Sequence, residues 1–420
     1  MTRTVIVGAG VAGVQTALEL RHRGYAGDIT LISEDMEEPY DRPPLSKEFL
    51  KGSVGRDTLG LLPAQTASER AITMRLGSQV SDLRTSEQQV VLSDGSSASY
   101  DYLVLATGAH NRPLPVPGAD LPGVWSLRGL DEAEGLRSAL ADAVDVVIVG
   151  GGFIGLEVAA VAQAHGARVT VVEFLPRVMA RVLSDQMSQH FAEEHRSRGV
   201  EILTGVGVTE VVAGLDGTAS SVTLSDGTVL PADLVVVGVG VLPATELAVK
   251  AGLHTSDGIV VDEQLRTSDS RIYAVGDCAR FNCVVTGRDL RLESIQNAAD
   301  QARFVAAQIA SMSEPSSANS QTPSYAALPW FWTEQYNSKL QIAGVAPLEA
   351  DSVVRGDPTS GSFSVCRFVG ERLVAVESVN QARDHLGARK LLAANSNQIR
   401  RVTRAAVADI TTALKTLLDV

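Results

Sequence analysis

The sequence predicts an α/β protein with two Rossmann-like dinucleotide-binding domains followed by a C-terminal α+β domain. Two segments, residues 4–13 and 146–155, each combine a run of apolar β-branched residues with glycines at the G-x-G-x-x-G spacing. Strand-like stretches without this motif occupy the end of the chain, at residues 340–343, 363–368 and 373–378. A length of 420 residues allows two or three domains with separate cores.

In the first segment, three β-branched residues typical of a buried parallel strand precede Gly8, Gly10 and Gly13. The first glycine permits a tight turn, the second admits a pyrophosphate against the backbone, and the third lets a helix pack close to the strand. The pyrophosphate would lie at the helix N-terminus, where free N–H groups favour anions. The next strand, 29–33, precedes Glu34, whose carboxylate can hold a ribose hydroxyl.

The second segment repeats this pattern of strand, glycines and helix. Its glycines are Gly150, Gly152 and Gly155, and the strand that follows ends in Glu173. Two complete fingerprints in one chain are far more specific than one. They imply two bound dinucleotides.

The proline-rich stretch 38–47 excludes a regular helix and predicts an extended connection. It could be an ordinary solvated loop, or Arg42 could neutralise a pyrophosphate while Lys47 reaches the ring end of a long cofactor. Glu157 is expected in the first turn of the helix that follows Gly155. There it could simply be stabilised by the helix dipole, or it could pair with Lys47 where the two cofactors meet. The residues alone leave both alternatives open.

Composition excludes several other classes of protein. The net charge of −13 argues against a nucleic-acid binder, which needs clustered Lys and Arg. No signal-like or membrane-spanning apolar run is present, and three cysteines do not form a disulfide framework. The histidines and cysteines lack metal-ligand spacing. We therefore expect a cytoplasmic protein without a bound metal or a membrane partner.

Three later features complete the pattern. The strand-like run 272–277 places Asp277 at the carboxyl edge of a parallel sheet, where ligands bind in doubly wound folds. Residues 311–325 are rich in Ser and Pro and predict a linker. Beyond it, we expect Trp330 and Trp332 to face opposite sides of a strand, one in the core and one toward a cofactor or partner.

Together these motifs resemble the FAD- and NADH-dependent ferredoxin reductases of the putidaredoxin reductase type, as far as about residue 390. The matching motifs lie at residues 7–13, 42–47, 105–108, 150–157, 274–279, 293–297 and 329–332. The resemblance implies a glutathione-reductase-like architecture. Residues 1–112 and 242–322 would form a discontinuous FAD-binding domain, 113–241 an NAD-binding domain, and 323–420 the C-terminal α+β domain. One departure is Ala244, where relatives usually have asparagine.

The resemblance also implies site residues. FAD would be contacted by Gly8, Gly10, Ala12, Gly13, Glu34, Arg42, Lys47, Val80, Ala106, Arg128, Asp277, Ile295 and Trp330. NAD would be contacted by Gly150, Gly152, Ile154, Gly155, Glu157, Glu173, Arg181 and Gly240. Lys47 and Glu157 would form the catalytic pair beside the flavin. A [2Fe–2S] ferredoxin would dock near Trp330 and Trp332, with a basic patch of Lys339, Arg383, Arg389 and Lys390 as our candidate for its electrostatic attraction.

The resulting hypothesis is a flavoprotein ferredoxin reductase. It would transfer hydride from NADH to FAD and then single electrons to the ferredoxin, which serves a cytochrome P450 or a ring-hydroxylating oxygenase. Preference for NADH rests on Glu173, which would repel a 2′-phosphate, although Arg177 and Arg181 could accommodate one. Two alternatives remain. One is a pyridine-nucleotide disulfide reductase or NADH oxidase, although Cys278 and Cys283 follow Asp277 and do not lie in the first βαβ unit, where such an enzyme needs its redox cysteine. The other is a non-catalytic NADH-sensing flavoprotein.

Overall fold

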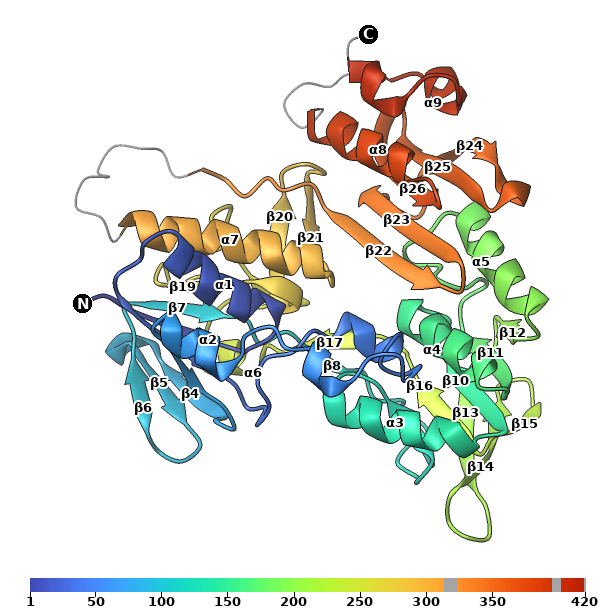
Figure 1. The fold of residues 1–420 in the computed structure, drawn as a ribbon, viewed down its shortest axis with the longest axis horizontal. Helices are drawn as coiled ribbons and strands as arrows, with labels where there is room; N and C mark the ends of the chain where they lie inside the picture. Colours follow the sequence, from blue (N-terminus) through green and yellow to red (C-terminus); the bar gives the residue numbers. More distant parts are fainter. Residues whose placement is uncertain (313–322, 395–401, 419–420) are drawn as a thin grey trace. The chain divides into compact units, whose positions relative to one another are not determined.

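The computed structural model describes residues 1–312, 323–394 and 402–418, and its contacts divide the chain into two compact units (Figure 1). The first unit comprises residues 1–41, 57–110 and 242–329. The second comprises residues 42–56, 111–241 and 330–420. The three predicted domains remain a proposal, and most of the predicted linker lies at residues 313–322, outside the described residues.

The first unit is built on a five-stranded parallel sheet with the order β3-β2-β1-β7-β19. β1 lies at the centre because Thr4 to Val7 are buried on both faces, as their apolar β-branched run predicts. The strand order reverses between β1 and β7, which creates a topological switch point. The strands are β1 (Arg3–Val7), β2 (Asp28–Ile32), β3 (Ile72–Arg75), β7 (Tyr102–Leu105) and β19 (Ile272–Ala274).

Helices α1 (Val11–His22) and α7 (Ile295–Met312) pack against each other in this unit (Figure 1). Two small sheets accompany the parallel one. Their strands are β4 (Val80–Arg84), β5 (Gln89–Leu92), β6 (Ser97–Ser99), β18 (Ile259–Val260), β20 (Ala279–Cys283) and β21 (Arg288–Leu290). Further helices of this unit are α2 (Ala64–Glu69) and α6 (Glu246–Lys250). Strands β8 (Ala109–Asn111) and β17 (Val241–Pro243) pair with each other where the chain passes between the units, at residues 110–111 and 241–242.

The second unit contains another five-stranded parallel sheet, with the order β12-β11-β10-β16-β9. Its strands are β9 (Val124–Ser126), β10 (Asp145–Val149), β11 (Arg168–Glu173), β12 (Glu201–Thr204) and β16 (Leu234–Val237). The helices of this part are α3 (Leu130–Asp142), α4 (Phe153–Ala164) and α5 (Asp185–Ser197). A small antiparallel sheet is formed by β13 (Val208–Ala213), β14 (Ala219–Leu224) and β15 (Val229–Pro231).

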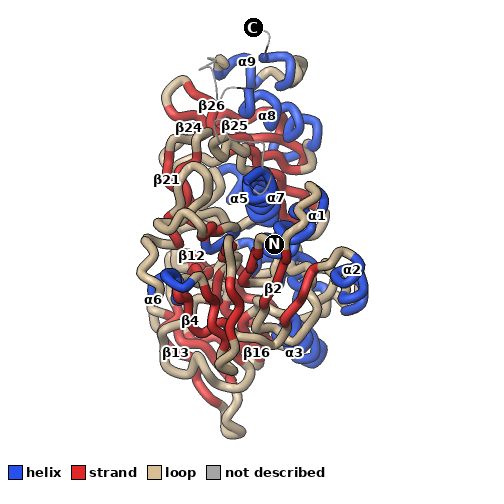
Figure 2. The backbone as a smooth tube through the Cα atoms, turned by 90° about the vertical axis from the view of Figure 1, so that its left-hand side faces the viewer, coloured by secondary structure: helices blue, strands red, loops and turns tan. Residues whose placement is uncertain are grey.

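The C-terminal part of the second unit is a five-stranded antiparallel sheet with the order β22-β23-β26-β25-β24. Helix α8 (Ala382–Ala394) packs on β23 and β26, and short α9 (Arg404–Ala408) lies against β24 (Figures 1 and 2). The strands are β22 (Trp330–Gln335), β23 (Ser338–Gly344), β24 (Asp351–Asp357), β25 (Ser362–Val369) and β26 (Arg372–Val379).

One apolar core connects the parts of the second unit. Leu50 from the segment 42–56, Leu156 from α4 and Phe363 from β25 are all fully buried in it. The segment 42–56 therefore packs with the second unit although both of its flanks belong to the first. Among the described residues, no helix is long and apolar enough to cross a membrane.

Two glycines allow their helices to approach the central strands closely. A Cβ atom added at Gly13 would lie 1.9 Å from the carbonyl oxygen of Gly8, and one at Gly155 would lie 2.1 Å from that of Gly150. Both approaches are shorter than any ordinary Cβ contact. Each helix must therefore have a glycine at this position.

We predict that Gly13→Ala lowers the melting temperature by several degrees, because overpacking of this kind costs about 1–3 kcal/mol. The control is Gly60→Ala in the same unit, since nothing lies within 4 Å of its added Cβ atom. Thermal unfolding followed by circular dichroism compares the two variants. Equal melting temperatures would contradict the tight packing at Gly13.

Candidate functional site

A glycine-lined turn joins β1 to α1 in the first unit. Gly8 has a φ of +107°, and a Cβ atom there would lie 2.2 Å from the carbonyl oxygen of Ala106, at the end of the neighbouring β7. Gly10 is the N-cap of α1, and no side chain in the described residues caps this helix. The N–H groups of its first turn are therefore available to an anion, as a pyrophosphate requires.

Other predicted FAD residues gather at the same edge of the sheet. Asp277 follows β19, and a Cβ atom at its neighbour Gly276 would lie 3.2 Å from the Cβ of Ala12 and 3.7 Å from that of Ala298 in α7. Ile295 is the first residue of that helix. The exposed Glu34 follows β2, and the buried Val80 begins β4. Four predicted FAD residues, Arg42, Lys47, Arg128 and Trp330, belong to the second unit, so their contact with FAD stays a prediction.

The second unit repeats the glycine turn between β10 and α4. Gly150 has a φ of +109°, and its added Cβ atom would lie 2.5 Å from the carbonyl oxygen of Gly238. Gly152 is the N-cap of α4, again without a capping side chain among the described residues. Glu173, at the end of β11, accepts hydrogen bonds from the backbone N–H groups of Gly151 (2.7 Å) and Leu175 (2.8 Å). The carboxylate of Glu173, which we predicted to bind a ribose, is thus fixed beside the turn.

Two arginines follow Glu173, and the structure separates their roles. The Nη2 atom of Arg181 lies 3.2 Å from the Cβ position of Gly240, which has a φ of +99°. Arg181 and Gly240 are therefore in contact, as expected for two residues of one site. Arg177 instead forms an ion pair with Asp185 (2.8 Å) and donates to the carbonyl oxygen of Leu183. Its guanidinium is already engaged within the unit.

Glu157 does not lie in the first turn of its helix. The helix α4 begins at Phe153, which places Ile154 in the first turn, 45% exposed, and Glu157 in the second. The side chain of Glu157 is buried, with only 3% of its surface exposed. The helix dipole, which acts mainly in the first turn, is therefore not what stabilises this carboxylate.

The carboxylate of Glu157 accepts hydrogen bonds from three side chains. Its Oε2 atom accepts from Lys47 Nζ (2.8 Å) and from Ser46 Oγ (2.5 Å). Its Oε1 atom accepts from Thr333 Oγ1. The predicted pairing of Lys47 with Glu157 is confirmed, and its position beside a flavin stays a prediction.

Lys47 follows the short 3₁₀ helix η1 (Pro43–Ser46) and is buried. Its ammonium group also donates to the carbonyl oxygen of Pro43 (3.2 Å) and lies 5.4 Å from the ring centroid of Trp332. An ammonium group has three N–H donors. Within the described residues of the second unit, two of them have an acceptor, Pro43 and Glu157, and the third has none.

The prediction that Trp330 and Trp332 face opposite sides of their strand is wrong. Residues two positions apart in a strand share a face, because side chains alternate. Trp330 packs against His385 of α8, with ring centroids 5.6 Å apart, whereas the intervening Phe331 packs against Phe153 of α4 at 4.5 Å. Both tryptophans are partly exposed. Neither is a core residue.

Two of the four predicted docking cations contact these tryptophans. The guanidinium carbon of Arg389 lies 4.5 Å from the ring centroid of Trp330, and Lys339 Nζ lies 5.9 Å from that of Trp332. Lys339 also pairs with Glu334 at 2.7 Å, which offsets its charge. Arg383 and Lys390 are exposed on α8, the helix of Arg389. The docking surface itself stays a prediction.

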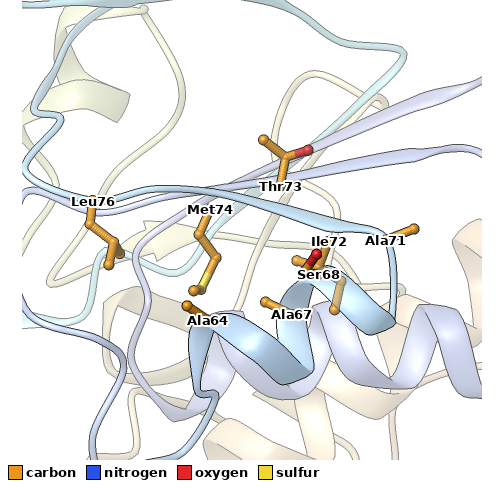
Figure 3. Close-up of a pocket in the computed structure, with 8 residues that line it drawn as sticks. All are labelled: Ala64, Ala67, Ser68, Ala71, Ile72, Thr73, Met74 and Leu76. Atoms are coloured by element: carbon orange, nitrogen blue, oxygen red, sulfur yellow. The ribbon is translucent and has the colours of Figure 1, made fainter.

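A shallow pocket in the first unit lies apart from these residues. It is lined by small and apolar side chains of α2 and β3, including Ala67, Ile72 and Met74 (Figure 3). None of its lining residues is among the predicted site residues, and none is charged. Within the described residues, no cluster of His, Cys, Asp or Glu could hold a metal ion.

Comparison with known proteins decides the family. Residues 2–302 match the family described as pyridine nucleotide-disulphide oxidoreductase. The chain belongs to this family. Residues 330–418 also match the family described as reductase C-terminal. As a member of the oxidoreductase family, the chain has the predicted two-dinucleotide fold and binds FAD and NAD(H).

Individual relatives are similar over nearly the whole chain. Rhodocoxin reductase of Rhodococcus erythropolis is 49% identical over 93% of this chain and 89% of its own length. The crystal structure of the ferredoxin reductase for the CYP199A2 system from Rhodopseudomonas palustris is 43% identical, with a TM-score of 0.93 over 99% of each chain. Putidaredoxin reductase in its covalent complex with putidaredoxin is 38% identical, with a TM-score of 0.92 over 100% of this chain and 98% of the other. The predicted resemblance is confirmed.

Sequence reasoning missed two residues of the Glu157 cluster, Ser46 and Thr333. Ser46 lies inside the motif that pointed to Lys47, so its neighbourhood was a usable signal. Thr333 is 176 positions from Glu157 in the chain and follows the tryptophan pair. Nothing in its local sequence distinguishes it from an ordinary strand residue.

His385, whose ring packs against Trp330, is buried without a polar partner among the described residues. Only 1% of its surface is exposed, and neither ring nitrogen has a hydrogen-bond partner within the described residues. Burial, with a smaller contribution from the nearby charge of Arg389, lowers the pKa of His385 to about 4. The imidazole is therefore neutral at pH 7.

We predict that His385→Leu flattens the loss of melting temperature on acidification. An unfolded histidine has a pKa of about 6.5, so the folded wild type binds fewer protons than the unfolded chain between pH 6.5 and 4. This contribution to stability is present above pH 6.5 and is lost as the pH falls toward 4. Melting temperatures between pH 7.5 and 4.5 measure it, with the exposed His22→Leu as control. Parallel curves for wild type and His385→Leu would show that His385 does not titrate in this way.

Proposed function

We propose that this protein is an NADH-dependent ferredoxin reductase that serves a cytochrome P450 or a ring-hydroxylating oxygenase. The observation that carries the proposal is the presence of two glycine-lined dinucleotide cradles in one chain, together with the buried pair of Lys47 and Glu157. When bound, FAD accepts a hydride from the reduced nicotinamide and releases electrons one at a time to an iron–sulfur protein. The relatives named above include reductases of this kind.

The residues of the chain would bind and orient the two cofactors. The turns at Gly8 and Gly150 would hold the pyrophosphates through backbone N–H groups, and Glu34 and Glu173 would hold ribose hydroxyls. Lys47 would use its remaining N–H donor at the ring end of FAD, and its charge would favour the reduced, more negative cofactor. The pairing with Glu157 would keep that ammonium group in place.

NADH is the proposed donor because Glu173 would repel the 2′-phosphate of NADPH. The engagement of Arg177 by Asp185 supports this preference, since Arg177 is then not available to neutralise a phosphate. Arg181 remains as the cation that could accept one. Its contact with Gly240 supports a position beside the proposed NAD-binding turn.

The proposed electron acceptor is a [2Fe–2S] ferredoxin that docks on the exposed parts of Trp330 and Trp332. Support comes from the cations against these rings, Arg389 and Lys339, which suit an acidic partner.

The proposed location of the protein is the cytoplasm, as predicted from the sequence. All three cysteines of the chain are buried free thiols, which agrees with a reducing compartment.

No observation favours the disulfide-reductase alternative. Cys278 and Cys283 are both buried and unpaired. Burial also raises the pKa of the Cys278 thiol, which disfavours the reactive thiolate. The NADH-sensing alternative would be favoured by slow turnover with every ferredoxin and a long-lived reduced state.

We predict that the purified protein is yellow or becomes so on reconstitution with FAD, and that NADH drives rapid reduction of at least one member of a panel of purified [2Fe–2S] ferredoxins.

We also predict that kcat/KM is at least tenfold higher for NADH than for NADPH, because a 2′-phosphate beside Glu173 costs more than about 1.4 kcal/mol. Absorbance and steady-state kinetics make these measurements. A colourless protein that cannot take up FAD would end the proposal, and a preference for NADPH would end the assignment of Glu173.

We predict that Arg389→Gln raises the KM for ferredoxin about three- to tenfold at low ionic strength and weakens its salt dependence. The rate with NADH and ferricyanide should not change, because this small acceptor needs no docking surface. Arg168→Gln, at the opposite end of β11 from Glu173, is the charge-matched control. Identical KM values for the two variants would remove Arg389 from the docking surface.

A further inference from the structure

We infer that Thr333 is a positioning residue for Lys47 that acts through Glu157, and that strand β22 thereby holds the catalytic pair. This inference rests on the proposed function, in which Lys47 meets the ring end of FAD. All the contacts that carry it lie within the second unit. They join three segments that are distant in the chain: η1 with Lys47, helix α4, and strand β22.

The two oxygens of the Glu157 carboxylate have separate partners. Oε2 accepts from Lys47 and from its chain neighbour Ser46. Oε1 accepts from Thr333 Oγ1, which is its sole donor in the described part of the second unit. The position of the carboxylate is thus defined from both sides, by η1 on one and by β22 on the other.

Burial makes the hydrogen bond from Thr333 more important than it would be at the surface. Glu157 is 3% exposed and Thr333 is fully buried, so water cannot replace the hydroxyl group. Without it, Oε1 would be a charged acceptor left unsatisfied in the interior. The carboxylate can relieve this by rotating toward its other donors, and this rotation changes the position of Oε2 and the direction in which it holds Lys47.

Strand β22 also contacts the other member of the pair. The ring of Trp332, the residue before Thr333, lies 5.4 Å from Lys47 Nζ. Two consecutive residues of one strand therefore touch the carboxylate and the ammonium group. The same strand carries Trp330 and Trp332, the rings of the proposed docking surface, so the strand that would receive the partner also fixes the group that would stabilise reduced FAD.

The test compares Thr333→Val, which removes the hydroxyl at nearly constant shape, with Thr333→Ser, which keeps it. Three quantities are measured on the FAD-loaded protein: the rate constant for reduction by saturating NADH in stopped flow, the midpoint potential of the bound FAD, and the melting temperature. Thr170→Val is the matched control, because Thr170 also donates to a glutamate, Glu201 (3.1 Å), away from Lys47.

We expect Thr333→Val to slow reduction about tenfold, which corresponds to about 1.4 kcal/mol, and to shift the midpoint potential to a more negative value. The NADH concentration that gives half-maximal rate should change less than twofold, because the Thr333 hydroxyl donates to Glu157 and, among the described residues, makes no hydrogen bond to the glycine turn at Gly150 and Gly152. Thr333→Ser should have a rate within twofold of the wild-type rate and a midpoint potential close to the wild-type potential. Thr170→Val should leave both unchanged.

A purely structural role for Thr333 would lower the melting temperature of Thr333→Val without altering the rate or the potential, and that result overturns the inference. So does a Thr333→Ser variant that is as slow as Thr333→Val. If Thr333→Val does not fold, Thr333→Ala replaces it with the same expected results. Failure of the proposed function is distinguishable, because wild-type protein would then not bind FAD or not be reduced by NADH.

Discussion

The carboxylate of Glu157 is the constraint on which the second unit depends. A buried charge is tolerated only when nearby groups compensate it, and removing one partner of such a pair leaves a strongly unfavourable charge behind. Here the compensation comes from Lys47, Ser46 and Thr333, which belong to segments far apart in the sequence. One side chain therefore requires that the segment 42–56, helix α4 and strand β22 come together during folding. The apolar core that contains Leu50 packs these same three segments together.

The two cradles show how an acidic protein can bind two anionic dinucleotides. The chain has a net charge of −13, yet the groups offered to the pyrophosphates are backbone N–H groups at helices that begin with glycine N-caps. Carboxylates are placed where neutral ribose hydroxyls are expected, at Glu34 and Glu173. If the main chain recognises the phosphates in this way, the net charge of the protein does not limit the binding of these ligands.

The sequence was informative wherever function depends on a local pattern. A strand, three glycines and a helix occupy one continuous stretch, so both turns and Glu173 could be located from the residues alone. The pairing of Lys47 with Glu157 could only be given as one of two alternatives, because 110 positions separate the two residues. The contact of Thr333 could not be predicted, since strand pairing in the C-terminal sheet decides which side chains reach α4. The prediction about Trp330 and Trp332 failed for a local reason. It put residues two positions apart on opposite faces of a strand, although side chains alternate at every residue, so no long-range contact was needed to avoid the error.

The division of the chain between the two units has a consequence for biosynthesis. The chain passes from one unit to the other at residues 41–42, 56–57, 110–111, 241–242 and 329–330. In the first unit, β7 pairs with β19, which follows it in the chain by more than 160 residues. The sheet around β1 therefore stays incomplete until late in synthesis. Long-range strand pairing of this kind is slow and leaves apolar edges exposed. A nascent chain of this protein therefore carries an unpaired edge at β7 until β19 has been synthesised, and neither unit can be produced intact by cutting the gene at a single point.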